Sequence, residues 1–458
     1  MEARVLSPCG VIGSGFPESS FERGLSMKPH VIACDGGSTD NGPAFLGAGK
    51  PNFSRSATKR DLKLMLQGRE SLGVPVIVGS CGTAGGDAGL EWMRDICLEI
   101  AREEGLSFNL ALVHGEQDKA YLKKRYKEGR IRALDPAPPL DEEIIENSAH
   151  IVGMMGDEPI ARALDEGADV VLTGRASDTS VFACHPVRMG ADRGLSWHAA
   201  KILECGAACA VHRARPDGCF AWIRDDHFVV EPLNPQMYCT PQSVASHTLY
   251  ENTDPYRITE PAGVLDTSRS AYSAESERAV RVAGSEFHTA ERYSIKLEGA
   301  ELVGYQSVII GGVRDPMILK QLDSWLDGIR EGFETRVQEI FPDRETPPAY
   351  QLTIRVFGRD AVMGTLEPEA GRIPHEVGLL FEVTAEDQVS AGTMASTLAH
   401  FALHYPIPEW GGLISTLAFP FTPAELEKGP VYRFNLNHVV YPDDPYEMFP
   451  TETMEVAN

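Results

Sequence analysis

Three short loops rich in Gly, Ser, Thr and Asp narrow the choice of fold, because each directly follows an apolar run typical of a buried strand. The loops are 35–40, 80–87 and 174–179, and the apolar runs before them are 30–34, 74–78 and 169–173. An open α/β sheet builds its ligand crevice where strands lead through such loops into helices. The sequence therefore predicts one site assembled by several loops at the carboxyl ends of strands.

Strand-like and helical patterns alternate from about residue 5 to residue 180. Apolar residues at helical spacing predict helices, and short apolar runs predict strands. The segment 74–114 is predicted to be a βαβ unit, with parallel strands joined by a right-handed crossover. The predicted helices are 58–72, 89–104, 140–149 and 159–167, and the further strands are 109–114, 150–154 and 170–172. This alternation predicts an α/β fold with a mostly parallel sheet and helices on both faces.

A chain of 458 residues is too long for one ordinary core, so two domains are expected. The Pro-rich segment 341–348 is the predicted linker. We expect an α/β domain over residues 1–340 and a small α+β domain over 349–458. In the small domain strands are predicted at 350–357, 376–384 and 431–440 and a helix at 392–405, an order compatible with a ferredoxin-like sandwich.

The net charge of −24 argues against nucleic acid as a partner, because phosphate backbones bind basic surfaces. No run reaches the roughly 18–20 apolar residues of a membrane span, and the N-terminal residues lack the pattern of a signal peptide. Nine cysteines without regular spacing are typical of reduced thiols in a cytoplasmic protein. A homo-oligomer is expected from the frequency of self-association among enzymes of this size.

The first two loops are candidate ligand-binding segments. Consecutive backbone N–H groups before a helix attract anions such as phosphate, a carboxylate or the phosphates of coenzyme A. Neither loop continues into the Gly-Lys-Ser/Thr of a nucleotide-binding P-loop, and tight turns at strand ends are the alternative interpretation. The predicted substrate-binding residues here are Gly36, Gly37, Ser38 and Thr39 in the first loop and Cys81, Gly82, Thr83, Gly85 and Gly86 in the second.

The third loop places an arginine and a carboxylate after a strand. Arg175, beside Gly174, could clamp a substrate carboxylate through paired hydrogen bonds, or could form a structural ion pair with Asp178. The candidate groups for proton transfer are Asp178, Asp87, His114 and Asp35.

No metal site is predicted and no cofactor is assigned. Cys205, Cys209 and His212 fall on one helical face, but no second Cys/His cluster accompanies them, so core packing is the better interpretation. Gly13 and Gly15 lack the third glycine of a dinucleotide-binding turn.

The order of motifs resembles the acyclic terpene utilisation (AtuA) family. The resemblance rests on 13–15, on 173–175 with Asp178, and on the run 249–256 followed by Pro261 and Asp266. It covers roughly residues 8–330, and the tail 350–440 is similar in outline to the small ferredoxin-fold domain that accompanies the family. The loop 35–40 and the stretch 213–228 depart from the family pattern. The resemblance implies catabolism of branched acyl compounds or small carboxylic acids.

Together these features favour an enzyme that adds or removes water, or moves a double bond, in a small carboxylic acid or its thioester. The glycine loops would stabilise a developing enolate, and the acid–base groups would move the proton. Two alternatives are a nucleotide-dependent enzyme that binds phosphate at the two glycine loops, and a non-catalytic subunit of a metabolic complex.

Overall fold

The computed structural model describes residues 1–213, 215–342, 347–407 and 416–457. They form two compact units: a large unit of Met1–Glu301 with Arg433–Asn458, and a small unit of Leu302–Tyr432. These bounds differ from the expected ranges 1–340 and 349–458, because the strands β15 (Ile295–Val313) and β18 (Glu425–Val440) each run through a boundary. Residues 343–346 of the predicted linker lie outside the described residues.

The large unit is built on a ten-stranded sheet with a parallel centre. Its order is β12-β13-β9-β8-β1-β2-β3-β7-β4-β19. The five central strands are parallel, and they are β1 (Ala3–Ser7), β2 (Val31–Cys34), β3 (Val76–Val78), β7 (Val170–Thr173) and β4 (Phe108–Val113). The flanking strands pair antiparallel and are β8 (Cys219–Ile223), β9 (Phe228–Pro232), β13 (Val280–Ala283), β12 (Ala271–Ala274) and β19 (Thr451–Val456).

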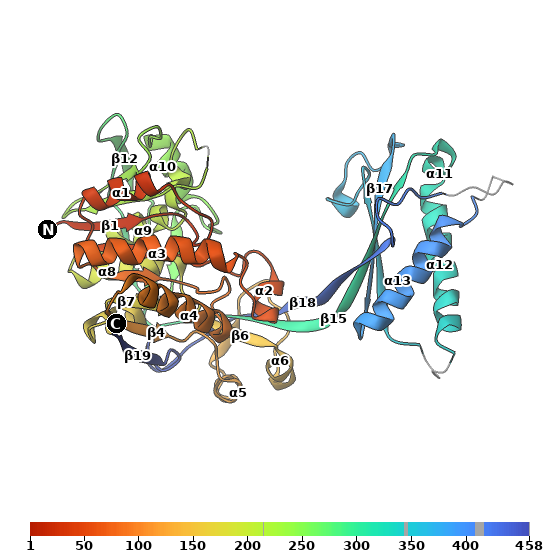
Figure 1. Cartoon of the computed structure of the whole chain (residues 1–458), viewed down its shortest axis with the longest axis horizontal. Helices are drawn as coiled ribbons and strands as arrows, with labels where there is room; N and C mark the ends of the chain where they lie inside the picture. Colours follow the sequence, from red (N-terminus) through yellow and green to blue (C-terminus); the bar gives the residue numbers. More distant parts are fainter. Residues whose placement is uncertain (214, 343–346, 408–415, 458) are drawn as a thin grey trace. The chain divides into compact units, whose positions relative to one another are not determined.

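Alternate residues of each central strand enter two different cores. In β2, Val31 and Ala33 pack in one core, and Ile32 and Cys34 pack in the other. The first core includes side chains of α7 (Asp157–Asp165), α8 (Asp178–Arg188) and α9 (Arg193–Leu203), and the second those of α1 (Glu18–Ser26), α3 (Arg55–Leu72) and α4 (Asp87–Glu104). Because strand side chains alternate between faces, helices must cover both sides of the sheet (Figure 1). The predicted α/β class with helices on both faces is confirmed.

Two predicted pairings are different in the structure. β3 and β4 are parallel, but β7 lies between them and pairs with both. β6 (His150–Met154) stays outside the large sheet and pairs antiparallel with the first part of β15. The other elements of this unit are α2 (Pro43–Ala48), α5 (Lys119–Lys127), β5 (Ile131–Ala133), α6 (Glu142–Asn147), η1 (Gly206–Cys209), α10 (Pro241–Thr248), β10 (Arg257–Glu260), β11 (Gly263–Asp266) and β14 (Glu286–Thr289).

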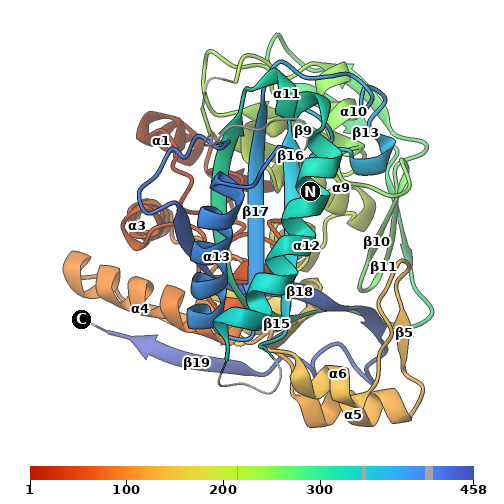
Figure 2. The ribbon, with the colours of Figure 1, turned by 90° about the vertical axis from the view of Figure 1, so that its right-hand side faces the viewer.

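The small unit follows the order β-α-β-β-α-β. Its strands lie in the order β16-β17-β15-β18, and α12 and α13 cover one face of them (Figure 2). This is the order of a split βαβ sandwich, whose first strand and helix come from residues before 349. The elements not yet given are α11 (Pro316–Lys320), α12 (Leu322–Ile340), β16 (Tyr350–Phe357), η2 (Gly364–Leu366), β17 (Val377–Ala385) and α13 (Gln388–Leu403). No helix in the described part of the chain has the length and apolar character needed to cross a membrane.

Candidate functional site

The loops after β3 and β7 are joined to each other by backbone hydrogen bonds at the carboxyl edge of the parallel strands. Ser80 N–H donates to Gly174 O (3.0 Å), and Arg175 N–H donates to Gly85 O (2.9 Å). A Cβ on Gly85 would lie 2.2 Å from the Arg175 nitrogen, and the φ of 67° at Gly85 is in the left-handed region that glycine favours. Glycine at this position therefore allows the two loops to pack backbone to backbone.

Most of the other predicted ligand-binding glycines also pack against protein backbone. An added Cβ would lie 2.5 Å from Gly79 O at Gly36, 2.3 Å from Gly89 Cα at Gly82 and 2.3 Å from Gly115 N at Gly174. Cys81 is fully buried, and burial raises the pKa of its thiol. The predicted substrate-binding residues that do not line the cavities described below are Gly36, Thr39, Cys81, Gly82, Gly85, Gly86 and Gly174.

Two adjoining cavities of the large unit lie at these loops, and we call them the acidic cavities. They have volumes of about 430 and 480 Å³. The first is lined by Gly10, Val11, Asp35, Gly37, Ser38, Asp40, Asn41, Asn52, Phe53, Thr83, Asp178, Glu204, Cys205, Tyr250 and Glu251. The second is lined by Asp40, Met154, Arg175, Ser177, Asp178, Thr179, Lys201, Glu204, Glu251, Asn252, Ile258, Thr259 and Glu260. Four carboxylate residues line both, so the two cavities form one site.

Arg175 is held by protein carboxylates on both sides. Its Nε donates to Glu298 (2.9 Å), and its Nη1 donates to Asp178 (2.9 Å) and to Ala176 O (2.8 Å). Glu298 also accepts from Thr39 Oγ1 (2.8 Å) and pairs with Lys296 (2.7 Å). Burial would raise the pKa of Glu298, but the charges of Arg175 and Lys296 outweigh burial and lower it to about 2. Arg175 and Asp178 thus form the ion pair that was the alternative to substrate binding by Arg175, and Thr39 contacts the same network.

Asp35 is a buried carboxyl with one oxygen unpartnered. Its Oδ2 accepts from Gly37 N–H (2.9 Å), whereas its Oδ1 has no hydrogen-bond partner among the described residues. Burial, and then the charge of Asp178, raise the pKa of Asp35 well above its ordinary value. Burial also raises the pKa of Asp178, although the charge of Arg175 opposes this change.

Three glutamates that line the cavities, Glu204, Glu251 and Glu260, were not predicted from the sequence. Glu204, at the end of α9, accepts from Thr179 Oγ1 (2.7 Å) and pairs with Lys201, and burial raises its pKa to about 7. Glu260, at the end of β10, accepts from Ser177 Oγ (2.6 Å), and burial raises its pKa to about 8. Glu260 lies shortly after the run 249–256, which supplies Tyr250 and Glu251 to the lining, whereas Glu204 has no such neighbouring motif.

Asp87 and His114 form a pair of their own. Their side chains lie 2.9 Å apart, and Glu116 accepts from Asp87 N–H (2.9 Å) and contacts His150. The hydrogen bond to Asp87 raises the pKa of His114. Neither Asp87 nor His114 lines the acidic cavities. The structure therefore brings together Asp35, Arg175 and Asp178 at the cavities, and it pairs Asp87 with His114 outside the lining.

The cysteines pack as a core. Cys209 is buried, with its Sγ 3.7 Å from that of Cys239 and 4.0 Å from that of Cys219, and the ring of His212 lies 5.5 Å from that of Tyr238. Across the described ranges no group of three or more His, Cys, Asp or Glu side chains is arranged to hold a metal ion.

The fold is that of an α/β protein with cavities at the carboxyl ends of its parallel strands, where such folds bind ligands. Residues 51–210 match the sequence model of the family described as "Acyclic terpene utilisation family protein AtuA", so this part of the chain is similar to the AtuA family. The matched range contains the second and third loops and Glu204, and it ends before the run 249–256. Searches of the curated proteins and of the solved structures returned no match.

Proposed function

We propose that the protein is a catabolic enzyme that acts on an acyl compound by acid–base catalysis, either adding or removing water or moving a double bond. The observation that carries the proposal is a set of buried carboxyls that line one site, with one oxygen of Asp35 left without a partner among the described residues. Burial raises the pKa of Asp35 well above its ordinary value and the pKa of Glu204 to about 7. Carboxyls whose pKa values are raised in this way are suited to general acid–base catalysis near neutral pH.

The geometry suggests the role of each group. Oδ2 of Asp35 accepts a hydrogen bond from Gly37 N–H, whereas Oδ1 has no partner among the described residues, so a proton carried by this carboxyl would lie on Oδ1. Asp35 is then the proton donor. Glu204, about half ionised at neutral pH, is the proton acceptor. Arg175 is a positioning residue, because its hydrogen bonds hold the carboxylates of Asp178 and Glu298 in place.

The charge of the lining favours an acyl thioester over a free acid. Asp40, Asp178, Glu204 and Glu251 line both cavities, and a substrate carboxylate there would meet like charges. The guanidinium of Arg175, expected to bind that carboxylate, already donates to protein oxygens through Nε and Nη1. A thioester is uncharged at the reacting carbons. The name of the AtuA family, which refers to acyclic terpenes, supports a branched apolar acyl chain that would contact Val11, Phe53 and Tyr250.

Proton transfer is tested by incubating the purified protein in deuterium oxide with a panel of unsaturated and 3-hydroxy acyl thioesters and the matching free acids. Nuclear magnetic resonance then measures deuterium at the carbons next to the thioester. We expect incorporation with at least one thioester, and a loss of about 10²–10⁴-fold in Asp35→Asn and in Glu204→Gln. Loss of the base below its pKa should make the rate fall as the pH drops below about 7, and this limb should be absent in Glu204→Gln.

The matched control is Glu286→Gln, which removes one exposed carboxylate outside the cavities and should leave the rate unchanged. The proposal fails if no compound exchanges, or if Asp35→Asn and Glu204→Gln both exchange at the rate of the unaltered protein. In that case a non-catalytic role would be the better explanation.

A further inference from the structure

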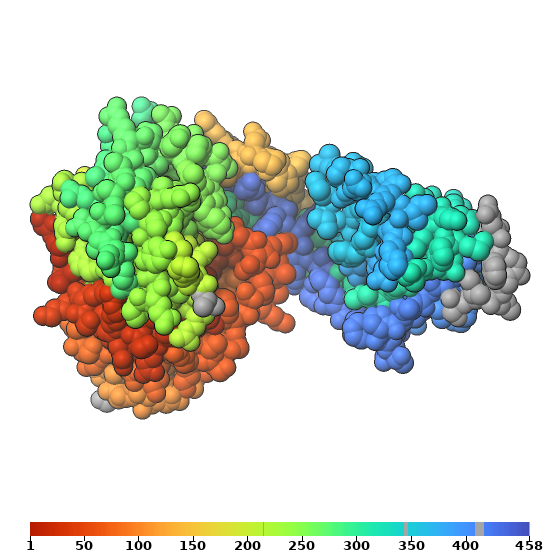
Figure 3. All heavy atoms as spheres, turned by 90° about the horizontal axis from the view of Figure 1, so that it is seen from above, coloured from red at the N-terminus to blue at the C-terminus, as the bar shows by residue number. Residues whose placement is uncertain are grey.

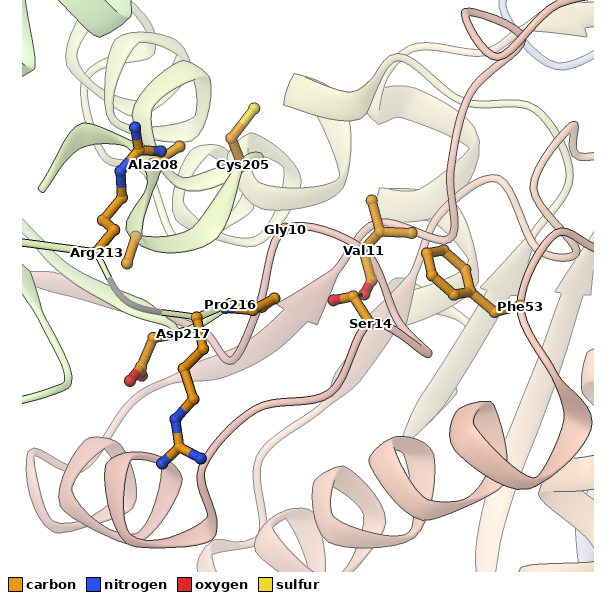
Figure 4. A pocket seen from close by; sticks show the side chains of 11 residues that line it. Gly10, Val11, Ser14, Phe53, Cys205, Ala208, Arg213, Pro216 and Asp217 are labelled. Carbon is orange, nitrogen blue, oxygen red and sulfur yellow. Dashed lines mark hydrogen bonds between the residues drawn. The ribbon is translucent and has the colours of Figure 1, made fainter.

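A third cavity of the large unit, of about 450 Å³, adjoins the first acidic cavity and carries arginines instead of a carboxylate cluster. We call it the arginine cavity. It is lined by Gly10, Val11, Ser14, Phe53, Cys205, Ala207, Ala208, Arg213, Arg215, Pro216 and Asp217. Gly10, Val11, Phe53 and Cys205 also line the first acidic cavity, so these four residues form a shared wall. Figure 4 shows Arg213 across the cavity from Phe53, with Gly10 and Val11 between them.

The two arginines are available to a ligand. Both side chains are exposed, and neither has an ion-pair partner among the described residues. This is notable in a chain of net charge −24, where most arginines find a carboxylate. The space-filling view shows the red N-terminal segment and the yellow-green segment after residue 200 side by side on the surface of the large unit (Figure 3).

The one carboxylate in the lining is already satisfied. Asp217 is buried and accepts from Ser20 Oγ (3.1 Å), from Asn234 Nδ2 (3.0 Å) and from Gly218 N–H (2.8 Å). No ion pair joins it to Arg213 or Arg215 among the described residues. Within the described residues the backbone N–H groups of Gly10 and Val11 donate to no protein oxygen, which leaves two further donors on the shared wall.

We infer that the arginine cavity binds the phosphate groups of a phosphorylated handle on the substrate, whose acyl end lies in the acidic cavities. Guanidinium groups bind phosphate through paired, charge-assisted hydrogen bonds, and free backbone N–H groups supply further donors. The inference rests on the proposed function for the placing of the acyl end. Phosphate is the shared chemistry of two sources: the nucleotide end of coenzyme A in an acyl thioester, and a free nucleotide.

Isothermal titration calorimetry of the full chain with coenzyme A, and separately with ADP with and without magnesium, tests the inference. The test variant is Arg213→Gln/Arg215→Gln. The matched control is Arg257→Gln/Arg269→Gln, which removes the same charge from two exposed arginines outside the cavities. We expect coenzyme A to bind, with a Kd about 30-fold higher in the test variant, unchanged in the control, and rising with salt. A thioester of N-acetylcysteamine, which has no phosphate, should exchange deuterium equally in all three proteins.

Each outcome of the titrations either supports or overturns the phosphate site. Binding of ADP as tightly as coenzyme A, with the same loss in the test variant, supports the phosphate site and assigns it to a free nucleotide. The inference is overturned if neither coenzyme A nor ADP binds. It is also overturned if the compounds that bind have the same Kd for the test variant as for the control. Failure of the proposed function would be seen separately, as binding of coenzyme A without deuterium exchange in any thioester.

Discussion

Glu298→Gln is the substitution that best tests the network behind the site. Glu298 is buried and its pKa falls from an ordinary 4.5 to about 2 because of Arg175 and Lys296. This fall corresponds to about 3 kcal/mol of folding free energy at neutral pH. We therefore expect Glu298→Gln to lower the free energy of unfolding by about 3 kcal/mol at pH 7. At an m-value of about 3 kcal/mol/M, the urea midpoint should fall by about 1 M.

The pH dependence gives the sharper test. A carboxylate whose pKa is lower in the folded state stabilises above its unfolded pKa, and loses this contribution as the pH falls toward the folded pKa. The difference in the free energy of unfolding between Glu298→Gln and the unaltered protein should have its full value at pH 7. It should shrink below about pH 4.5 and be about 1.4 kcal/mol at pH 3. Urea unfolding followed by circular dichroism at each pH measures it. Glu286→Gln, which removes an exposed carboxylate, should change stability by under about 0.5 kcal/mol throughout. A difference for Glu298→Gln that stays constant from pH 7 to pH 3 would refute the reasoning.

Two further substitutions test the packing of the loops and the pair outside the cavities. Gly85→Ala should lower the free energy of unfolding by at least about 3 kcal/mol, because its Cβ would meet the Arg175 backbone. The control Gly105→Ala has a similar φ of 65° but open space around its Cβ, and should cost about 1–2 kcal/mol. Thermal unfolding measures both costs, and equal costs would contradict the packing argument. His114→Gln should lose under about 1 kcal/mol below pH 6.5, and this loss should vanish as the pH rises through the raised pKa of His114, because only the imidazolium is stabilised by Asp87. Melting temperatures from pH 5.5 to 9 measure this, and a loss that grows with pH would count against the ion pair. If proton transfer is confined to the acidic cavities, deuterium exchange should be unchanged in His114→Gln.

The strands and helices of the first 180 residues were predictable because their signals are local. The apolar run of β7, for example, needs only its own residues to be recognised. Its place between β3 and β4 could not be predicted, since strand neighbours are chosen by long-range packing and not by adjacent residues. Asp35, Arg175 and Asp178, which line the acidic cavities, could be chosen as candidates because each follows a strand. Glu298 could not, because it lies inside a long strand and 123 residues from the arginine it holds.

The last strand has a consequence for how the chain is made. β19 covers the edge of β4, pairing Thr451 with Val113 and Val456 with Phe108. During synthesis β4 leaves the ribosome more than 300 residues before its partner β19. The backbone edge of β4 therefore stays unpaired while the whole small unit is translated. Removing residues 451–456 would leave that edge permanently open, and we would expect such a shortened chain to aggregate during expression even though every residue of the acidic cavities is present.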